Sequence, residues 1–200
     1  MALEVPKNSS IVNYVYTRGE LFDTLTVNSV KFAIFNKPLT NSEASRSLNI
    51  AADCNCVFLA PVEAEGDIVI NAVNILALES FSAKTGATRV HANNFYGLGL
   101  EFKGNVSIQT DRDALIVGLH GNMGKVHVKA ERHANVRGGL TLQIQEIVTR
   151  VKRLCTQGID QTDGIQIAEA LLTATQALND LNQERALSFE PARTLALRDS

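Results

Sequence analysis

Between residues 111 and 133 the chain places acidic and histidine side chains close together in sequence. Asp111 and Asp113 flank Arg112. Paired acids on a β-helix serve carbohydrate-active enzymes as proton donor and base. Two acids at this spacing are also typical of a turn, because an Asp side chain accepts hydrogen bonds from nearby backbone. We favour the turn and keep the acid pair as an alternative catalytic site.

His127, Glu131 and His133 form a second candidate group. Together with Lys129 they share one face if the strand that holds them stays extended. Two histidines and a carboxylate can hold zinc or iron. The solvent-exposed face of an outer strand has the same composition, and we favour that interpretation. We therefore expect neither a bound metal nor another cofactor.

A glycine-rich stretch from Gly118 to Val126 has some features of a phosphate-binding loop. Five residues, where the motif requires four, separate Gly118 from the Gly124-Lys125 pair, and Val126 replaces the Ser or Thr that would hold magnesium. An alternating strand pattern follows, where phosphate binding would need a helix N-terminus. The stretch predicts a glycine corner between two strands.

Cys54 and Cys56 are predicted on the same face of one strand, and the third cysteine, Cys155, is distant in sequence. No further Cys or His pair lies at a metal-ligand spacing, so we expect the two thiols to pack in the core as small apolar groups. An odd number of cysteines favours a reducing compartment. His91 and His120 have no evident acidic partner in the sequence and are expected at the surface.

Short apolar pairs recur at intervals of about twenty residues, the length of one coil of a solenoid. In each pair two inward positions alternate with polar neighbours, as in a half-buried strand. The series runs through Leu48/Ile50, Ile68/Ile70, Val90/Ala92, Val106/Ile108 and Val126/Val128. A second apolar series lies between these pairs, so each coil holds at least two strands. An antiparallel sandwich with the same strand spacing is the alternative.

Glycines are spaced as corners between these strands, where the chain needs positive φ. The expected corner glycines are Gly66, Gly86, Gly104, Gly121, Gly124, Gly138 and Gly139. The inward positions Ile50, Ile68, Ile70, Ile108, Val126 and Val128 are expected to be buried and to stack in register from coil to coil.

The stretch from Glu65 to Leu76 (EGDIVINAVNIL) resembles a coil of the filamentous-haemagglutinin type of bacterial β-helix repeat. It is also similar to the coils of bactofilins, the cytoplasmic polymer-forming β-helix proteins of bacteria. The likeness covers residues from about Ser47 to Gly139. It implies a stacked β-helix fold, and because neither family is enzymatic in its repeat region, it implies a structural role.

The spacing of apolar residues changes to a helical one after the repeats. Leu142, Ile144, Ile147, Val148, Val151 and Leu154 lie on one face of a first predicted helix. We expect a β cap at 1–46, a β-solenoid at 47–142, a helical hairpin at 143–187 and a tail at 188–200. The fold class is therefore mainly β: a solenoid of about five coils with a C-terminal two-helix segment.

The second predicted helix carries an apolar stripe that a two-helix hairpin cannot bury alone. Its members are Ile167, Leu171, Leu172, Leu178 and Leu181. Leaving several such side chains in water costs about 1.5–3 kcal/mol each. The stripe predicts contact with another chain, either in a homo-oligomer or with a protein partner.

Composition excludes several classes of protein. The 200 residues carry a formal net charge of −2, and neither a basic excess nor a basic stripe indicates nucleic-acid binding. No apolar run has the length to span a bilayer. The N-terminus lacks the pattern of a secretory signal, so a cytoplasmic location is expected, with signal-free export as an alternative.

The first functional hypothesis is a non-enzymatic, self-associating or partner-docking scaffold. The alternatives are an enzyme, carbohydrate-active or metal-dependent, with its site on the solenoid, and a secreted bacterial effector or virion component that uses the solenoid as a binding rod.

Overall fold

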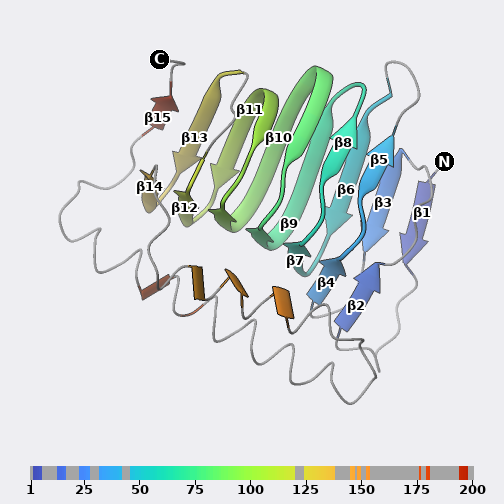
Figure 1. Ribbon diagram of the computed structural model, residues 1–200, viewed down its shortest axis with the longest axis horizontal. Helices are drawn as coiled ribbons and strands as arrows, with labels where there is room; N and C mark the ends of the chain where they lie inside the picture. The colour runs from blue at the N-terminus through green and yellow to red at the C-terminus, as the bar shows by residue number, and fades with distance from the viewer. Residues whose placement is uncertain are drawn as a thin grey trace.

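The chain winds into a mainly β, parallel β-solenoid of about five turns (Figure 1). The computed structural model describes residues 2–5, 13–16, 23–27, 32–41, 46–119, 124–137 and 194–197, together with helical residues between 145 and 180. The described strands between residues 2 and 137 all pair in parallel, which confirms the predicted fold class and excludes the antiparallel sandwich.

The described strands of successive turns stack into three sheets. The first sheet contains β1 (Ala2–Val5), β3 (Thr24–Val27), β6 (Leu48–Ala52), the start of β9 (Ile68–Ala77), the middle of β10 (Phe81–Leu98), β11 (Phe102–Thr110) and β13 (Val126–Ala130). The second contains β2 (Asn13–Tyr16), β4 (Phe32–Phe35), β7 (Asn55–Phe58), the ends of β9 and β10, β12 (Asp113–Val117) and β14 (His133–Arg137). The third contains β5 (Leu39–Asn41), β8 (Val62–Ala64) and the starts of β10 and β11.

The predicted stacking of inward side chains is confirmed. Ile50 pairs with Ile70, which pairs with Val90, and the column continues through Ile108 to Val128. All five side chains are buried. A column of branched aliphatic residues suits this position because equivalent strands of successive turns place identical positions directly above one another.

The register of one turn differs from the prediction. Ile68 pairs with Thr88, while Val90 pairs with Ile70, so the inward pair of this turn is Thr88/Val90 and not Val90/Ala92. Thr88 is fully buried, and among the described residues its hydroxyl has no hydrogen-bond partner. Because the side chain of Thr88 is polar, this position does not appear in the sequence as a member of an apolar pair.

An aromatic column, which the sequence periodicity did not reveal, joins the second and third sheets. Phe35 stacks on Phe58 with ring centroids 4.8 Å apart, and Phe58 meets Phe81 edge-on at 5.5 Å. Phe102 continues the column at 6.0 Å from Phe81. These rings fill the core with large apolar area at favourable aromatic geometry.

The glycines have two distinct roles. Of the expected corner glycines among the described residues, only Gly104 has positive φ, at 96°; Gly99 and Gly118 also have it. Gly86 and Gly124 are required by close packing between turns instead. A Cβ on Gly124 would lie 2.3 Å from the Gly104 carbonyl oxygen, and one on Gly86 would lie 2.6 Å from the backbone nitrogen of Asp67.

The stack extends beyond the predicted solenoid at both ends. In the segment expected as a cap, β1 pairs with β3 and β2 with β4 in the same parallel manner as the later turns. At the other end, β15 (Thr194–Leu197) pairs antiparallel with β13. It covers an edge of the first sheet that would otherwise present unpaired backbone groups. The sequence predicted only a tail at residues 188–200.

Helical residues are present in both predicted helices. Residues 145–146, 148–149 and 152–153 are helical, as are 176 and 179–180. In Figure 1 the helical pieces lie alongside the lower flank of the solenoid, next to the second sheet. Within the described part of the chain, no helix is long and apolar enough to cross a membrane.

Candidate functional site

A ladder of polar side chains marks the start of the second sheet in successive turns. Asn55, Asn74, Asn94, Asp113 and His133 occupy equivalent positions, each one turn beyond the last. The position lies at the corner between the first and second sheets. Side chains that repeat here can bond to one another because parallel in-register strands bring them within reach.

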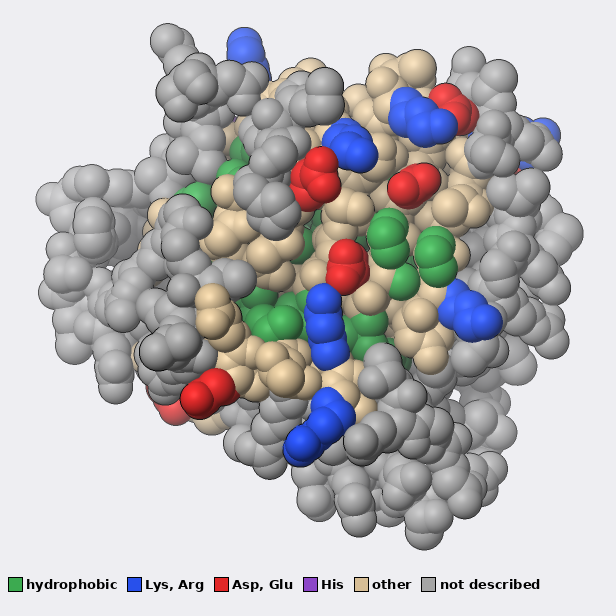
Figure 2. Space-filling view, in the orientation of Figure 1, with side chains coloured by type: hydrophobic (Ala, Val, Ile, Leu, Met, Phe, Trp, Pro, Cys, Tyr) green, Lys and Arg blue, Asp and Glu red, His purple; other side chains and the backbone are tan. Residues whose placement is uncertain are grey.

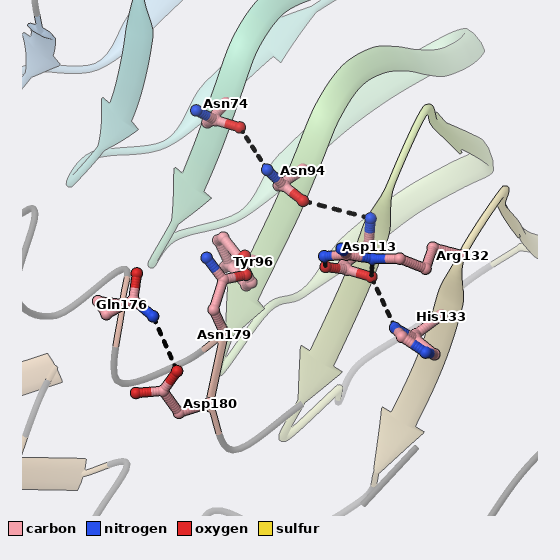
Figure 3. A network of polar contacts seen from close by, with 9 residues as sticks. All are labelled: Asn74, Asn94, Tyr96, Asp113, Arg132, His133, Gln176, Asn179 and Asp180. Carbon is pink, nitrogen blue, oxygen red and sulfur yellow. Dashed lines mark hydrogen bonds and ion pairs between the residues drawn. The ribbon is translucent and has the colours of Figure 1, made fainter. Parts of the chain in front are cut away.

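The asparagines form a directed chain of hydrogen bonds (Figure 3). Asn74 Nδ2 donates to Asn55 Oδ1 at 2.7 Å, and Asn94 Nδ2 donates to Asn74 Oδ1 at 2.7 Å. An amide suits this role because it has both a donor and an acceptor. These bonds tie neighbouring turns together where the chain changes direction.

At Asp113 the ladder changes from amide side chains to a carboxylate. An ionised carboxylate has no donor, and here the backbone N–H of Asp113 donates to Asn94 Oδ1 at 3.3 Å. The Asp113 side chain is fully buried, and its carboxylate accepts from Arg132 Nε at 3.0 Å and from Arg132 Nη2. His133 Nδ1 lies 2.9 Å from Asp113 Oδ1. The hydrogen bonds to Asp113 raise the pKa of Arg132.

This geometry leaves one chemically usable atom. A buried carboxylate that contacts Nδ1 of a histidine fixes the orientation of the ring and, in the tautomer with the proton on Nδ1, leaves Nε2 as a proton acceptor. The His133 side chain is 26% exposed, whereas Asp113 is inaccessible. Any chemistry at this cluster would therefore use His133, with Asp113 as the positioning group.

Tyr96 lies beside the cluster, on the outer side of the second sheet (Figure 3). Its ring is buried and its hydroxyl donates to Asn179 Oδ1, which belongs to the C-terminal helical segment. Burial, and then the negative charge of Asp113, raise the pKa of Tyr96 well above its usual value. The hydroxyl therefore remains a protonated donor at physiological pH.

The two predicted acids, Asp111 and Asp113, have separate roles. Asp111 lies in the exposed bend between β11 and β12, as the turn interpretation predicted, and its Oδ1 is 3.2 Å from His91 Nε2. His91 is exposed, as expected, and its acidic partner lies one turn away in space, where the linear sequence does not show it. Asp113 belongs to strand β12 and not to the turn.

The predicted histidine cluster is divided by a corner. His127 and Lys129 are exposed on β13, and Glu131 in the bend after it pairs with Lys129 at 3.1 Å. The chain bends at residues 131–132, so His133 starts the next strand, on the second sheet. Among the described residues no group of three or more His, Cys, Asp and Glu could hold a metal ion.

The Cys54–Cys56 pair packs in the core as predicted, with both thiols buried and free. A hydrogen bond between the two thiols lowers the pKa of Cys54 and, together with burial, raises the pKa of Cys56. Cys155 and His120 lie outside the described residues.

A row of apolar side chains lies on the outside of the second sheet, and it includes Val57 and Leu76 from the second apolar series of the sequence. Strand alternation points these residues away from the core, yet each is at most 4% exposed. Successive strands pair them in register as Ile34, Val57, Leu76, Tyr96 and Leu115. We call this set the outer apolar row. Its signal was the unbroken apolar run in several strands, such as Leu115-Ile116-Val117, which is typical of strands covered on both faces.

Contacts from the C-terminal helical segment identify what lies near the outer apolar row. Asn179 accepts from the Tyr96 hydroxyl, and Lys152 Nζ donates to Glu79 Oε1 at 2.9 Å, just after β9. The predicted oligomerisation residues Ile167, Leu171, Leu172, Leu178 and Leu181 lie outside the described residues.

Comparison with protein-family models, with curated proteins and with solved structures finds no match to this chain. The structure therefore supports the expected β-solenoid fold, and none of the comparisons supports a haemagglutinin or bactofilin type.

Proposed function

We propose that this protein is a non-enzymatic scaffold, a β-helical rod that associates with itself and holds its partners through protein–protein contacts. The observation that carries the proposal is the regular stack of turns, in which parallel strands pair in register and inward side chains form one apolar core. Stacked turns of this kind form a long, regular surface on which other proteins can bind. The outer apolar row is covered within the chain, since each of its members is at most 4% exposed.

The roles of the polar candidates also support a structural function. Asn94 and Asp113 bond one turn to the next, and the two exposed pairs His91–Asp111 and Lys129–Glu131 lie on the outside of the coils. The contacts of Asn94 and Asp113 hold neighbouring turns together, and the two exposed pairs keep the outer surface of the coils polar.

The exposed face of the first sheet suits weak, polar docking of a protein. Arg89, His91, Gln109 and Lys129 project from neighbouring strands of this face and are exposed. Figure 2 shows acidic and basic side chains interspersed over the face in view. A surface without a single dominant sign fits a protein partner better than a polyanion such as nucleic acid.

The experiment that tests this function changes Leu171 and Leu178 together to Glu. If the predicted stripe mediates association, this variant runs as a monomer in size exclusion with light scattering and keeps β-rich circular dichroism. The matched control changes Gln176, an exposed residue of the same segment, to Glu and should leave the mass unchanged. A double variant with the unmodified protein's oligomeric mass would contradict the proposal.

The second candidate function is an enzyme that uses His133 as a general base. The observation that favours it is the 2.9 Å contact between buried Asp113 and half-buried His133. In a screen against polysaccharides and esters, a His133→Ala variant must lose activity that the unmodified protein shows, while His127→Ala retains it. Activity that survives both changes would remove this candidate.

A further inference from the structure

Cys54 and Cys56 lie on either side of Asn55, at the corner where the first sheet passes into the second. Cys54 is in the bend after β6, and Cys56 is the second residue of β7. Both side chains belong to the buried core of the solenoid. Because the two thiols flank a single residue and enter the same core, they contact each other through a hydrogen bond.

The two thiols differ in how readily they react. The contact with Cys56 lowers the pKa of Cys54 and so favours its thiolate, the form that attacks an oxidant. The same contact, together with burial, raises the pKa of Cys56, which keeps its proton. Cys54 directly follows exposed Asp53 in the bend, so a small oxidant reaches Cys54 from the corner. Cys54 is therefore the attacking sulfur, and Cys56 is placed to resolve the product.

We propose that Cys54 and Cys56 form a redox-sensitive pair that a peroxide converts into a disulfide. The thiolate sulfur of Cys54 attacks one oxygen of hydrogen peroxide, the O–O bond breaks, and the leaving hydroxide takes up the proton that Cys54 had released. The sulfur of Cys56 then attacks the resulting sulfenic acid. The S–S bond forms, the S–O bond breaks, and hydroxide leaves as water with the proton of Cys56. The pair is oxidised, and hydrogen peroxide is reduced to water. This inference is independent of the proposed scaffold function.

Oxidation should weaken the amide ladder. A disulfide requires a narrow range of Cα separations and torsion angles, so closing one across a single residue displaces the backbone of Asn55. Asn55 Oδ1 accepts from Asn74 Nδ2 at 2.7 Å. The backbone N–H of Val73 donates to the Cys54 carbonyl oxygen at 3.0 Å. Both bonds join this turn to the next, so the oxidised protein should be less stable than the reduced protein.

Hydrogen peroxide added to the folded, reduced protein tests the proposal. The dose is one that oxidises both cysteines fully when the protein is first unfolded. After treatment the protein is unfolded in urea with N-ethylmaleimide, which labels every remaining thiol, and is cut with trypsin. Cys54 and Cys56 fall in one peptide, residues 47–84, because Arg46 and Lys84 are successive cleavage sites.

The proposal predicts that this peptide carries no label, is lighter by two hydrogen atoms, and regains both thiols in dithiothreitol. Cys155→Ser should behave in the same way, whereas the peptide of Cys56→Ser should gain oxygen at Cys54 and lose no hydrogen. A peptide with both cysteines labelled would refute the proposal. A disulfide from either cysteine to Cys155 would also refute it, because the two thiols would then not react with each other.

Urea unfolding of the oxidised, unmodified protein tests the effect on the ladder. Its midpoint should lie at a lower urea concentration than that of the reduced protein, and dithiothreitol should restore the original value. An unchanged midpoint, in protein whose Cys54–Cys56 disulfide has been identified, would refute the weakening of the ladder.

Discussion

The side-chain oxygen of Asn94 accepts the backbone N–H of Asp113, one turn further along the solenoid, at 3.3 Å. Here the ladder changes from amide side chains to an ionic cluster, because Asp113 turns its carboxylate toward Arg132 and His133. The same buried acid therefore continues the ladder through its backbone and anchors the last turn through its charge.

Asp113 should be the most sensitive polar position of the ladder. Changing it to Ala removes its hydrogen bonds to Arg132 and His133, and we expect a loss of about 2–4 kcal/mol in the free energy of unfolding. Asp113→Asn should cost less, because an amide still offers an acceptor to Arg132 and can donate to Asn94. Urea unfolding measures both, with exposed Asp111→Asn as the control, expected within about 0.5 kcal/mol of the unmodified protein. Equal losses for the two Asp113 variants would show that the ladder does not accept an amide there.

Thr88 is a site where a substitution should stabilise the protein. Its buried hydroxyl has no partner among the described residues, and Val has nearly the same shape without a polar atom. Thr88→Val should raise the free energy of unfolding by about 1 kcal/mol. The same change at Thr110, which is also fully buried with an unpaired hydroxyl among the described residues, should act alike. A lower unfolding midpoint for Thr88→Val would mean that the hydroxyl is hydrogen-bonded in solution.

Gly124 should tolerate no side chain. A Cβ there would lie 2.3 Å from the Gly104 carbonyl oxygen, a backbone atom that cannot move without separating two turns. We expect Gly124→Ala to lower the free energy of unfolding by more than about 2 kcal/mol, through overpacking. Thermal unfolding followed by circular dichroism checks this, with exposed Ser107→Ala as the control. A Gly124→Ala variant as stable as the control would contradict the close contact between these turns.

The ion pair between Asp67 and Arg89 should give a small, pH-dependent stabilisation. Arg89, together with the Ala87 backbone N–H, holds the pKa of Asp67 below its usual value. A lowered folded-state pKa gives stability that is present above the unfolded-state pKa of about 3.9 and is lost as the pH falls through the folded value. Because both side chains are partly exposed, the effect should not exceed about 1 kcal/mol.

Asp67→Asn and Arg89→Gln both remove this pair. Each should therefore be less stable than the unmodified protein at pH 7, and the differences should shrink as the pH is lowered below about 4. Urea unfolding at a series of pH values, from pH 7 to below about 4, measures these differences in the free energy of unfolding. If these differences in stability instead grow as the pH falls, the charge of Asp67 does not stabilise the folded protein through Arg89.

The sequence predicted the repeat well where inward positions are apolar. Ile50, Ile70 and Ile108 were placed in one column because their spacing alone matches the length of a turn. Thr88 was not predicted as an inward position, because a polar residue in the core does not form part of an apolar pair. The length of β10, which runs through all three sheets, was also not predictable from alternation, because the corners within it are not marked by glycine alone.

The candidate site was harder to predict, because its contacts lie one turn apart in space. Asp111 and Asp113 were grouped by sequence, yet their partners His91 and His133 each come from a neighbouring turn. The outer apolar row could have been found from the unbroken apolar run at Leu115, but what contacts it depends on Lys152 and Asn179, which are distant in sequence.

Self-association is the property on which the proposed function depends. Size exclusion coupled to light scattering, on the unmodified protein over a range of micromolar concentrations, gives its mass in solution. The account predicts a dimer or a larger assembly, against the 21.7 kDa of one chain. A mass of one chain at every concentration would contradict it.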